Sequence, residues 1–308
     1  MTYTTITLRE LVGDVLNELS ENRDDIYVID SDLAKSTTTN KFEAKHPDRF
    51  IETGIAEQNA MSIAAGIAQE GKVAFYVNFA IFVSGTAWTQ LRQICYAKSN
   101  VKLIATHPGM DGGFDGATHH ANEDLALMRV LPNLKVLVPS NPDELRAAVK
   151  LAMEYDGPVY IRCVRDNVPN VPSTGNLEFG KSVVVEDNGN DFALIYEGSA
   201  TELAFNAFEE AKNRGLKGKL INAFSIKPFD TELVLSVAKS VDKIVTLENH
   251  SVIGGLGSLV SETVSVLDKH AKVYRVGVND VFTESGPSKL LKEKYGLNVE
   301  NVLSYITK

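Results

Sequence analysis

The sequence predicts an α/β protein of two domains, the first with a mostly parallel sheet covered by helices on both faces. Short apolar segments alternate with longer segments in which apolar residues recur at helical spacing. The length of 308 residues suits two ordinary domains. Residues 166–180 contain two prolines and two glycines among polar residues, which is typical of a linker. We therefore expect a first domain at residues 1–167, a linker at 168–184 and a second, smaller α/β domain at 185–308.

The first domain contains the elements of such a sheet in alternating order. The expected strands, short and apolar, lie at 26–29, 50–51, 72–77, 101–105, 135–138 and 158–162. The expected helices lie at 8–19, from 57 to about 68, 82–96, 123–129 and from 141 onward. The last of these begins with Asn141, Pro142, Asp143 and Glu144, residue types that favour a helix start.

The second domain continues the alternation with fewer elements. Its expected strands lie at 192–196, 219–222, 243–247 and 272–276, and its expected helices at 201–214, 230–240 and 257–270. Residues 254–257, Gly-Gly-Leu-Gly, lack the Gly-x-Gly-x-x-Gly spacing of a dinucleotide site. We expect a tight turn between a strand and a helix there.

Charge and composition exclude several classes of function. The net charge is −9, with 31 Lys and Arg against 40 Asp and Glu in mixed order, so no basic stripe is present to bind nucleic acid. Cys95 and Cys163 lie far apart in apolar settings, which argues against a disulfide framework or a metal site and favours a reducing compartment. The chain has no run of about twenty apolar residues and no basic leader, so we expect no membrane association and a cytoplasmic protein.

Polar residues follow several expected strands of the first domain. Glu57 lies in the first turn of a helix, directly after a strand and a glycine turn. Asp32 and Ser36 follow the first expected strand, and the glycine-rich loop at 106–120 carries three of the six histidines. Open α/β sheets bind ligands at the carboxyl ends of their strands, so these residues are candidates for a site. The alternative role for Glu57 is that of a solvated acid that complements the helix dipole.

Four segments resemble one known family. Residues 54–59, Gly-Ile-Ala-Glu-Gln-Asn, and 75–82, Phe-Tyr-Val-Asn-Phe-Ala-Ile-Phe, closely resemble the pyrimidine-binding domain of transketolase and related thiamine diphosphate enzymes. Residues 115–119, Asp-Gly-Ala-Thr-His, match the family in order and spacing, and 248–258 resemble the signature of the transketolase C-terminal domain. The resemblance covers essentially the whole chain. It implies the thiamine diphosphate-binding fold in the first domain and a transketolase C-terminal fold in the second.

The resemblance implies thiamine diphosphate as the cofactor. The glutamate at the Glu57 position of the family hydrogen-bonds a ring nitrogen of the aminopyrimidine, which favours the imino tautomer that the carbon chemistry needs. Phe79 and Phe82 match positions where aromatic rings pack against that ring, and their alternative role is in the core. Gly85 stands where many transketolases have a third aromatic residue, so one side of the ring pocket is expected to differ.

Further positions match the thiazolium and the phosphate end of a sugar substrate. Asp32 and Leu33 match positions near the thiazolium, where a carboxylate offsets the positive charge; the alternative role of Asp32 is in a turn or cap. The resemblance assigns the phosphate to Arg9, Ser36, His107 and Arg165. Two guanidiniums suit a dianion because each has forked donors and keeps its charge, although a single such arginine is more often a surface ion-pair residue.

The remaining matches concern the sugar itself. Asp115 and His119 match residues that contact the sugar hydroxyls and the carbonyl region, and a histidine there exchanges a proton with the substrate readily. His120 also falls in the expected substrate site, but relatives usually have glutamine at its position, which leaves the sugar open. The expected catalytic residues are Glu57, His107 and His119. His46, His250 and His270 are expected to have surface or structural roles.

A second chain is implied by what the sequence lacks. Complete transketolases have a domain that holds the diphosphate and its metal through a Gly-Asp-Gly motif, and no such motif occurs in these residues. We therefore expect a split transketolase, in which an N-terminal subunit holds most of the Mg²⁺ or Ca²⁺ coordination and assembles with this chain as a heterotetramer of two copies each. The chain alone is expected to form a homodimer. The implied reaction moves a two-carbon ketol unit from a ketose phosphate to an aldose phosphate.

Other functions in and outside this superfamily are the alternatives. A deoxyxylulose phosphate synthase fragment shares the main motifs, but its relatives lack the histidine at His107. The β subunit of a 2-oxoacid dehydrogenase lacks the Thr-His loop. A transketolase for a branched or sulfonated sugar stays open, because an arginine-lined site also accepts a sulfonate. A non-catalytic scaffold is disfavoured because it has no need for Glu57, Asp115 and His119.

Overall fold

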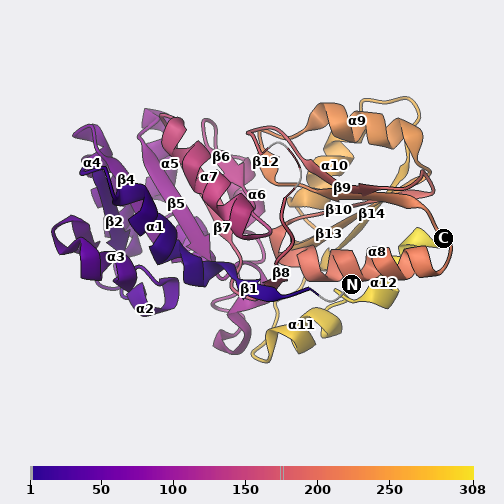
Figure 1. Ribbon diagram of the computed structural model, residues 1–308, viewed down its shortest axis with the longest axis horizontal. Helices are drawn as coiled ribbons and strands as arrows, with labels where there is room; N and C mark the ends of the chain where they lie inside the picture. The colour runs from indigo at the N-terminus through magenta and orange to yellow at the C-terminus, as the bar shows by residue number, and fades with distance from the viewer. Residues whose placement is uncertain (1–2, 174, 176) are drawn as a thin grey trace.

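The computed structural model describes residues 3–173, 175 and 177–308 (Figure 1). Two α/β units lie side by side along the long axis, the first coloured indigo to magenta and the second mostly orange to yellow. The predicted two-domain α/β fold is confirmed. No helix within the described residues is long and apolar enough to span a membrane.

The first unit contains a seven-stranded sheet in the order β12-β6-β7-β5-β4-β2-β3. Its strands are β2 (Ile26–Asp30), β3 (Phe50–Glu52), β4 (Val73–Phe79), β5 (Val101–Thr106), β6 (Lys135–Leu137), β7 (Val159–Cys163) and β12 (Ser225–Lys227). The first six pair in parallel, and β12 is antiparallel to β6. Since β12 comes from the second half of the chain, the two units share this sheet. Strands β4 and β5 are buried along their whole length, as their mostly apolar sequences predict.

Helices cover both faces of this sheet. They are η1 (Leu8–Leu11), α1 (Val12–Ser20), α2 (Ala34–Thr37), α3 (Asn40–Lys45), η2 (Pro47–Arg49), α4 (Glu57–Gln69), η3 (Phe82–Thr86), α5 (Trp88–Ala97), η4 (Met110–Asp115), α6 (Asp124–Arg129) and α7 (Pro142–Glu154). The predicted start of α7 is confirmed, because the Asn141 side chain accepts a hydrogen bond from the Glu144 amide. The single helices predicted at 8–19 and 82–96 each begin instead with a non-α turn, a 3₁₀ turn at η1 and a π turn at η3.

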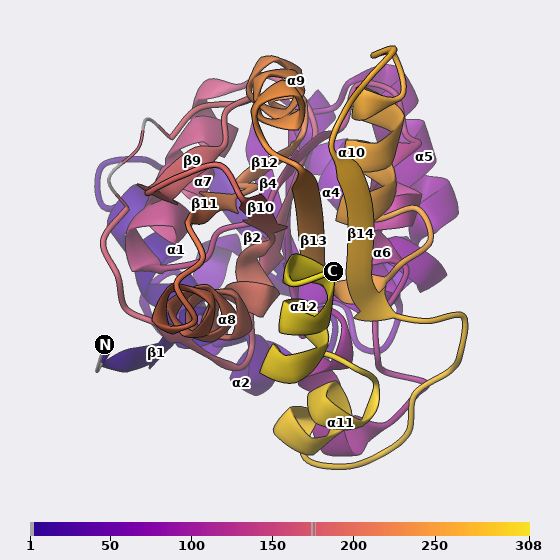
Figure 2. The same ribbon diagram turned by 90° about the vertical axis from the view of Figure 1, so that its right-hand side faces the viewer.

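The second unit contains a five-stranded sheet in the order β14-β13-β10-β11-β9 (Figure 2). Its strands are β9 (Val183–Asp187), β10 (Phe192–Tyr196), β11 (Gly218–Asn222), β13 (Lys243–Ser251) and β14 (Lys272–Val278). Its helices are η5 (Gly198–Ala200), α8 (Thr201–Asn213), α9 (Thr231–Ser240), α10 (Leu256–Val264), α11 (Ser288–Lys294) and α12 (Val299–Ile306). The helix predicted at 257–270 is too long: Val266 and Leu267 continue the apolar pattern, but Val266 lies after the helix and is exposed.

Part of the expected linker has regular structure. Strand β8 (Asn167–Pro169) pairs antiparallel with β1 (Thr5–Thr7) at the edge of the first unit. Residues 174 and 176 of the expected linker lie outside the described residues. The chain therefore returns to its own N-terminal segment before it enters the second unit, and the boundaries at 168 and 184 stay predictions.

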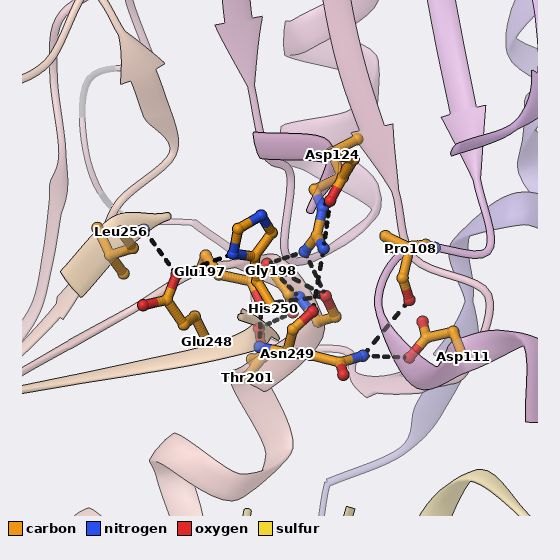
Figure 3. Close-up of polar contacts among 12 residues, drawn as sticks. Pro108, Asp111, Asp124, Glu197, Gly198, Thr201, Glu248, Asn249, His250 and Leu256 are labelled. Atoms are coloured by element: carbon orange, nitrogen blue, oxygen red, sulfur yellow. Dashed lines mark hydrogen bonds and ion pairs between the residues drawn. The ribbon is translucent and has the colours of Figure 1, made fainter. Parts of the chain in front are cut away.

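A buried ionic network joins the two units (Figure 3). Arg162 on β7 makes hydrogen bonds of 2.8 and 2.9 Å to Asp124 at the start of α6, and one of 2.8 Å to Glu197 after β10. Its guanidinium also donates to the Asn249 carbonyl in β13 at 3.0 Å. Burial raises the pKa of Asp124, but the charge and hydrogen bonds of Arg162 outweigh burial and hold that pKa below its usual value. The network fixes the second unit against the carboxyl end of β7.

Candidate functional site

The carboxyl ends of β2, β4, β5 and β7 meet at one edge of the first sheet. These strands lie next to one another and run parallel, so the residues that follow them come together. Most of the site residues predicted from the sequence lie at this edge. They come from the segment after β2, the start of α4, the end of β4, the glycine-rich loop after β5 and the residues after β7.

Aromatic side chains gather at the edge. The Phe79 and Phe82 rings are nearly parallel, with planes 9° apart and centroids 6.0 Å apart. The His107 ring packs on Phe79 with centroids 3.8 Å apart, and the His119 ring stands on Phe82 edge-on at 5.4 Å. Residues from β4, η3 and the glycine-rich loop therefore form one cluster. A Cβ added at Gly85 would meet a single neighbouring atom, at 3.9 Å, so the wall lacking the third aromatic residue is open.

Glu57 is the first residue of α4 and is half-buried. Within residues 3–173, 175 and 177–308, no hydrogen bond or ion pair engages its carboxylate. Burial raises the pKa of the nearby Tyr76 phenol, and the negative charge of Glu57 adds to that shift. A half-buried acceptor without a protein partner, beside parallel aromatic rings, fits the polar edge of a flat heteroaromatic ring.

The segment after β2 is held by an aspartate that sequence analysis did not select. Asp30 is fully buried and accepts hydrogen bonds from the Leu33 amide at 2.7 Å and from the Thr37 and Thr39 hydroxyls at 2.8 Å each. Burial raises the pKa of Asp30. Asp32 itself has a left-handed φ of 61° and an exposed side chain. The position of Asp30 at the end of a strand was the sequence feature from which this structural role could have been predicted.

Arg9 and Ser36, both predicted at the phosphate site, lie together. The Arg9 guanidinium donates to the Ser36 carbonyl at 2.7 Å, and the Arg9 amide donates to the Val164 carbonyl at 3.2 Å, which places Arg9 beside the end of β7. The Nε atom of Arg9 is buried without a hydrogen-bond partner among the described residues. A cationic group with spare donor capacity is therefore built into this edge.

His107 lies near enough to both predicted arginines to sense their charges. Burial, followed by the charges of Arg9 and Arg165, lowers the pKa of His107 to about 3. Its backbone has a left-handed φ of 56°, and its Nδ1 lies 2.9 Å from the Thr106 hydroxyl. His107 is therefore a neutral imidazole beside two guanidiniums. Arg165 also borders an open cavity of about 570 Å³ between the units.

The glycine-rich loop packs on the second unit. Gly109 has a φ of 56°, and a Cβ there would lie 2.1 Å from the Asn249 carbonyl oxygen, so no larger residue fits. The Asn249 side chain accepts from the Met110 amide at 3.1 Å and donates to Asp111 at 2.8 Å (Figure 3). Asp115 is exposed and His119 is half-buried, and both follow this anchored segment.

His120 is placed differently from the prediction. Its Nδ1 lies 2.6 Å from the Thr283 hydroxyl and its Nε2 lies 3.1 Å from the Gly113 carbonyl oxygen. The ring is 2 % exposed, and both nitrogens are used within the chain. His120 therefore ties the loop to the second unit, and the expected sugar contact is not what this structure shows. The sequence match to a glutamine position carried no information about Thr283, which lies 163 residues away.

The other three histidines lie outside the cluster. His46 contacts the Arg49 guanidinium at 2.7 Å, and His270 contacts the Ala271 carbonyl at 2.7 Å. His250 is fully buried and hydrogen-bonds the Ser251 carbonyl at 2.7 Å. No group of three or more His, Cys, Asp or Glu side chains among the described residues is arranged to hold a metal ion.

The fold and this edge together define an α/β protein in which strand ends bring aromatic rings, an acid and two arginines to one edge of a sheet. Two family models match the chain: "Transketolase, pyrimidine binding domain" over residues 4–171 and "Transketolase, C-terminal domain" over residues 180–302. The chain therefore belongs to the transketolase family, as its sequence resemblance predicts. Thiamine diphosphate is the cofactor of this family, and the predicted transketolase-type transferase is confirmed.

Relatives of similar length share both domains. A protein of Methanocaldococcus jannaschii described as a transketolase C-terminal section is 38% identical over 303 residues, which cover 97% of this chain and 95% of that protein. A 6-deoxy-6-sulfo-D-fructose transketolase subunit of a Clostridium species is 36% identical, covering 96% and 92%. A solved structure titled "Split gene transketolase, inactive beta4 tetramer" superposes with a TM-score of 0.87 at 43% identity, covering 98% of this chain and 97% of that one.

Proposed function

We propose that this chain is the C-terminal subunit of a split transketolase that moves a two-carbon ketol unit from a ketose phosphate to an aldose phosphate. The observation that carries the proposal is the convergence of the parallel Phe79 and Phe82 rings, the unpartnered Glu57 and the Arg9 and Arg165 charges at one edge of a sheet. Two of the similar proteins are described as a transketolase section and a split-gene transketolase, which supports this assignment.

The phosphate group of the sugar is proposed to bind between Arg9 and Arg165. Both side chains keep their charge and offer forked donors, which match the oxygens of a dianion. His107 adds a hydrogen bond from a neutral ring, because its lowered pKa keeps it uncharged at neutral pH. Ser36 is held beside Arg9 and supplies a hydroxyl at the same place.

The proposed roles of the remaining residues concern the reacting end of the substrate. Thiamine diphosphate, when bound, supplies the carbon nucleophile that this chemistry requires. Glu57 would share a proton with the ring nitrogen of the aminopyrimidine, and Asp32 and Leu33 would lie beside the thiazolium. His119, whose ring is fixed against Phe82, exchanges a proton with the substrate oxygen, and Asp115 accepts hydrogen bonds from the sugar hydroxyls.

The partner is proposed to be an N-terminal transketolase subunit that holds the diphosphate and its Mg²⁺ or Ca²⁺. Three large apolar side chains, in the segments that follow β3, β5 and β14, are exposed: Ile55 by 79%, Phe114 by 73% and Phe282 by 89%. Exposed apolar residues of this kind mark interaction surfaces. A second chain that covers them also closes the site, and two copies of each chain form the expected heterotetramer. Without its partner the chain is proposed to pair with itself.

A sulfonated sugar is the second candidate substrate. One relative is described as a 6-deoxy-6-sulfo-D-fructose transketolase subunit, and an arginine pair binds sulfonate and phosphate oxygens alike. Phosphate carries close to two charges at neutral pH, whereas sulfonate carries one, so two arginines favour the phosphate. A comparison of kcat/KM for the two donors separates these substrates.

Ketol transfer by the mixed subunits tests the proposal. This chain and the product of the neighbouring reading frame are purified separately, mixed with thiamine diphosphate and Mg²⁺, and assayed with ketose and aldose phosphates. The proposal expects transfer by the mixture and none by either chain alone. Absence of transfer with every phosphorylated and sulfonated sugar tested would contradict it.

A further inference from the structure

A lysine of the second unit lies between two aspartates beside the proposed anion site. Lys292 belongs to α11, and its Nζ lies 2.9 Å from an oxygen of Asp111 and 2.8 Å from an oxygen of Asp166. Asp111 belongs to the glycine-rich loop and is fully buried, and Asp166 follows β7. The Ser288 hydroxyl, also on α11, donates to the same Asp166 oxygen. One turn of α11 therefore binds two segments of the proposed site.

The two aspartates in turn hold Arg165. The second oxygen of Asp111 accepts hydrogen bonds from the Arg165 amide at 3.1 Å and the Asp166 amide at 3.3 Å. The second oxygen of Asp166 lies 3.5 Å from the Arg165 guanidinium. Lys292 therefore reaches Arg165 by two routes, one to its backbone and one to its side chain.

The ammonium group of Lys292 allows both carboxylates to stay charged. The pKa of Asp111 is raised to about 6, because burial and the charge of Asp166 raise it and Lys292 only partly opposes them. Burial lowers the pKa of Lys292, but the two aspartates outweigh burial and keep it above its usual value. Removal of the ammonium leaves the two carboxylates facing each other without a counter-charge, which favours repulsion or uptake of a proton by Asp111. Both changes weaken the hydrogen bonds that hold the Arg165 segment.

We infer that Lys292 is a positioning residue that sets Arg165 for the anionic group of the substrate. By this inference the second unit contributes to substrate affinity without touching the substrate. The inference rests on the proposed function, because it needs Arg165 to bind that anion.

The test compares a phosphorylated donor with one that has no phosphate. Lys292→Met is assembled with the partner subunit and assayed with a ketose phosphate and with hydroxypyruvate, each with glycolaldehyde as acceptor. We expect KM for the ketose phosphate to rise by about tenfold, as for the loss of one well-placed charged contact, while KM for hydroxypyruvate changes by less than about threefold. Lys292→Arg should recover most of the loss, because it restores the charge.

Lys289→Met is the matched control. Lys289 lies one turn earlier on α11, is exposed and makes no ion pair with a described residue. Its replacement should leave both KM values unchanged. Equal losses for the two donors in Lys292→Met, or no loss in either, would overturn the inference.

Two further measurements keep the inference testable if Lys292→Met does not assemble. Ser288→Ala removes the smaller contact to Asp166 and should raise KM for the ketose phosphate selectively, by about threefold. Hydrogen exchange on the chain alone should show faster exchange of the Arg165 and Asp166 amides in Lys292→Met than in Lys289→Met, and equal rates would count against the inference.

Failure of the inference can be told from failure of the proposed function. If the wild-type complex transfers no ketol unit, the proposed function fails. If the wild type is active but the variants lose affinity for both donors equally, only the role of Lys292 fails.

Discussion

Arg162 and Arg165 lie three residues apart at the end of β7 and have opposite surroundings. Arg162 is fully buried and makes two hydrogen bonds to Asp124, one to Glu197 and one to Ser199. The Arg165 side chain is 40% exposed, and its one ion pair among the described residues is to Asp166 at 3.5 Å. The first guanidinium is satisfied within the chain, and the second has donors left over.

The first-turn acids of two helices show the same contrast. Asp124 begins α6 and accepts hydrogen bonds from Arg162 and from the Tyr160 hydroxyl at 2.7 Å. Glu57 begins α4 without a partner for its carboxylate among the residues that the structure describes. The two arginines share their residue type and the two acids share their position at the start of a helix, so the difference within each pair lies in the contacts. Satisfied charges hold the two units together, and unsatisfied ones face the place where a ligand and a partner are proposed to bind.

The largest expected effect is on stability: replacement of Arg162 should destabilise the protein far more than replacement of Arg165. Arg162→Met leaves Asp124 and Glu197 buried without a counter-charge, so we expect a loss of about 3–5 kcal/mol in the free energy of unfolding. Arg165→Met removes a partly exposed group and should change it by no more than about 0.5 kcal/mol. Urea unfolding of the isolated chain measures both, and similar losses in the two variants would break the comparison.

Arg165→Met, which should hardly affect stability, should have the larger effect on substrate affinity. In the assembled complex, Arg165→Met should raise KM for a ketose phosphate by roughly tenfold to a hundredfold, because a hydrogen bond to a charged group contributes about 1.5–3 kcal/mol. Arg146→Met is the control, since Arg146 makes an exposed ion pair with Glu18 on the helical surface. Steady-state kinetics with both variants checks this, and an unchanged KM in Arg165→Met would remove Arg165 from the anion site.

The pH dependence of stability should report the environment of His107. Its folded pKa of about 3 lies below the value of about 6.5 in the unfolded chain, so between these values the unfolded chain binds a proton that the folded chain does not. Stability should therefore fall as the pH drops below about 6.5, by at most about 1.4 kcal/mol per pH unit from this residue. His107→Gln should lack this contribution. Urea unfolding of the wild type and of His107→Gln at several pH values from 7 to 4 tests this. If the free energy of unfolding falls equally with pH in both proteins, His107 lies in a more polar environment than the structure shows.

Gly85 should show the smallest effect. A Cβ at this position has open space apart from one contact at 3.9 Å, and the backbone does not need a positive φ. Gly85→Ala should leave the free energy of unfolding unchanged or raise it by up to about 1 kcal/mol, because alanine restricts the unfolded chain. A clear loss of stability, measured by urea unfolding, would show that the wall beside Phe82 is closed rather than open.

Local patterns in the sequence predict most of the fold. Mostly apolar runs predict β4 and β5, and the Asn141 to Glu144 segment predicts the start of α7. The positions of Glu57, Asp32 and the glycine-rich loop follow from the same reasoning, because the carboxyl ends of parallel strands share one edge. The roles of Arg9, Arg165, Phe79 and Phe82 were implied only by the family resemblance. The motif at Glu57 further predicts the family, and the family models confirm it.

Contacts between distant segments could not be predicted in this way. His120 is bonded to Thr283, β12 joins the first sheet from the second unit, and Lys292 reaches Asp111 across 181 positions of sequence. Such contacts depend on how the two units pack, which neither periodicity nor spacing encodes. Asp30 was missed for a related reason, since a buried aspartate with three donors differs from an exposed one only in its tertiary surroundings.

Thiamine diphosphate binding tests the central claim most directly, because the chain is proposed to hold one half of the cofactor. Calorimetry with Mg²⁺ compares this chain alone, the partner subunit alone, the mixture, and the mixture made with Glu57→Gln. The account predicts tight binding in the wild-type mixture, no tight binding by either chain alone, and weaker binding in the mixture with Glu57→Gln. Tight binding by this chain alone, or binding by the mixture that Glu57→Gln leaves unchanged, would contradict it.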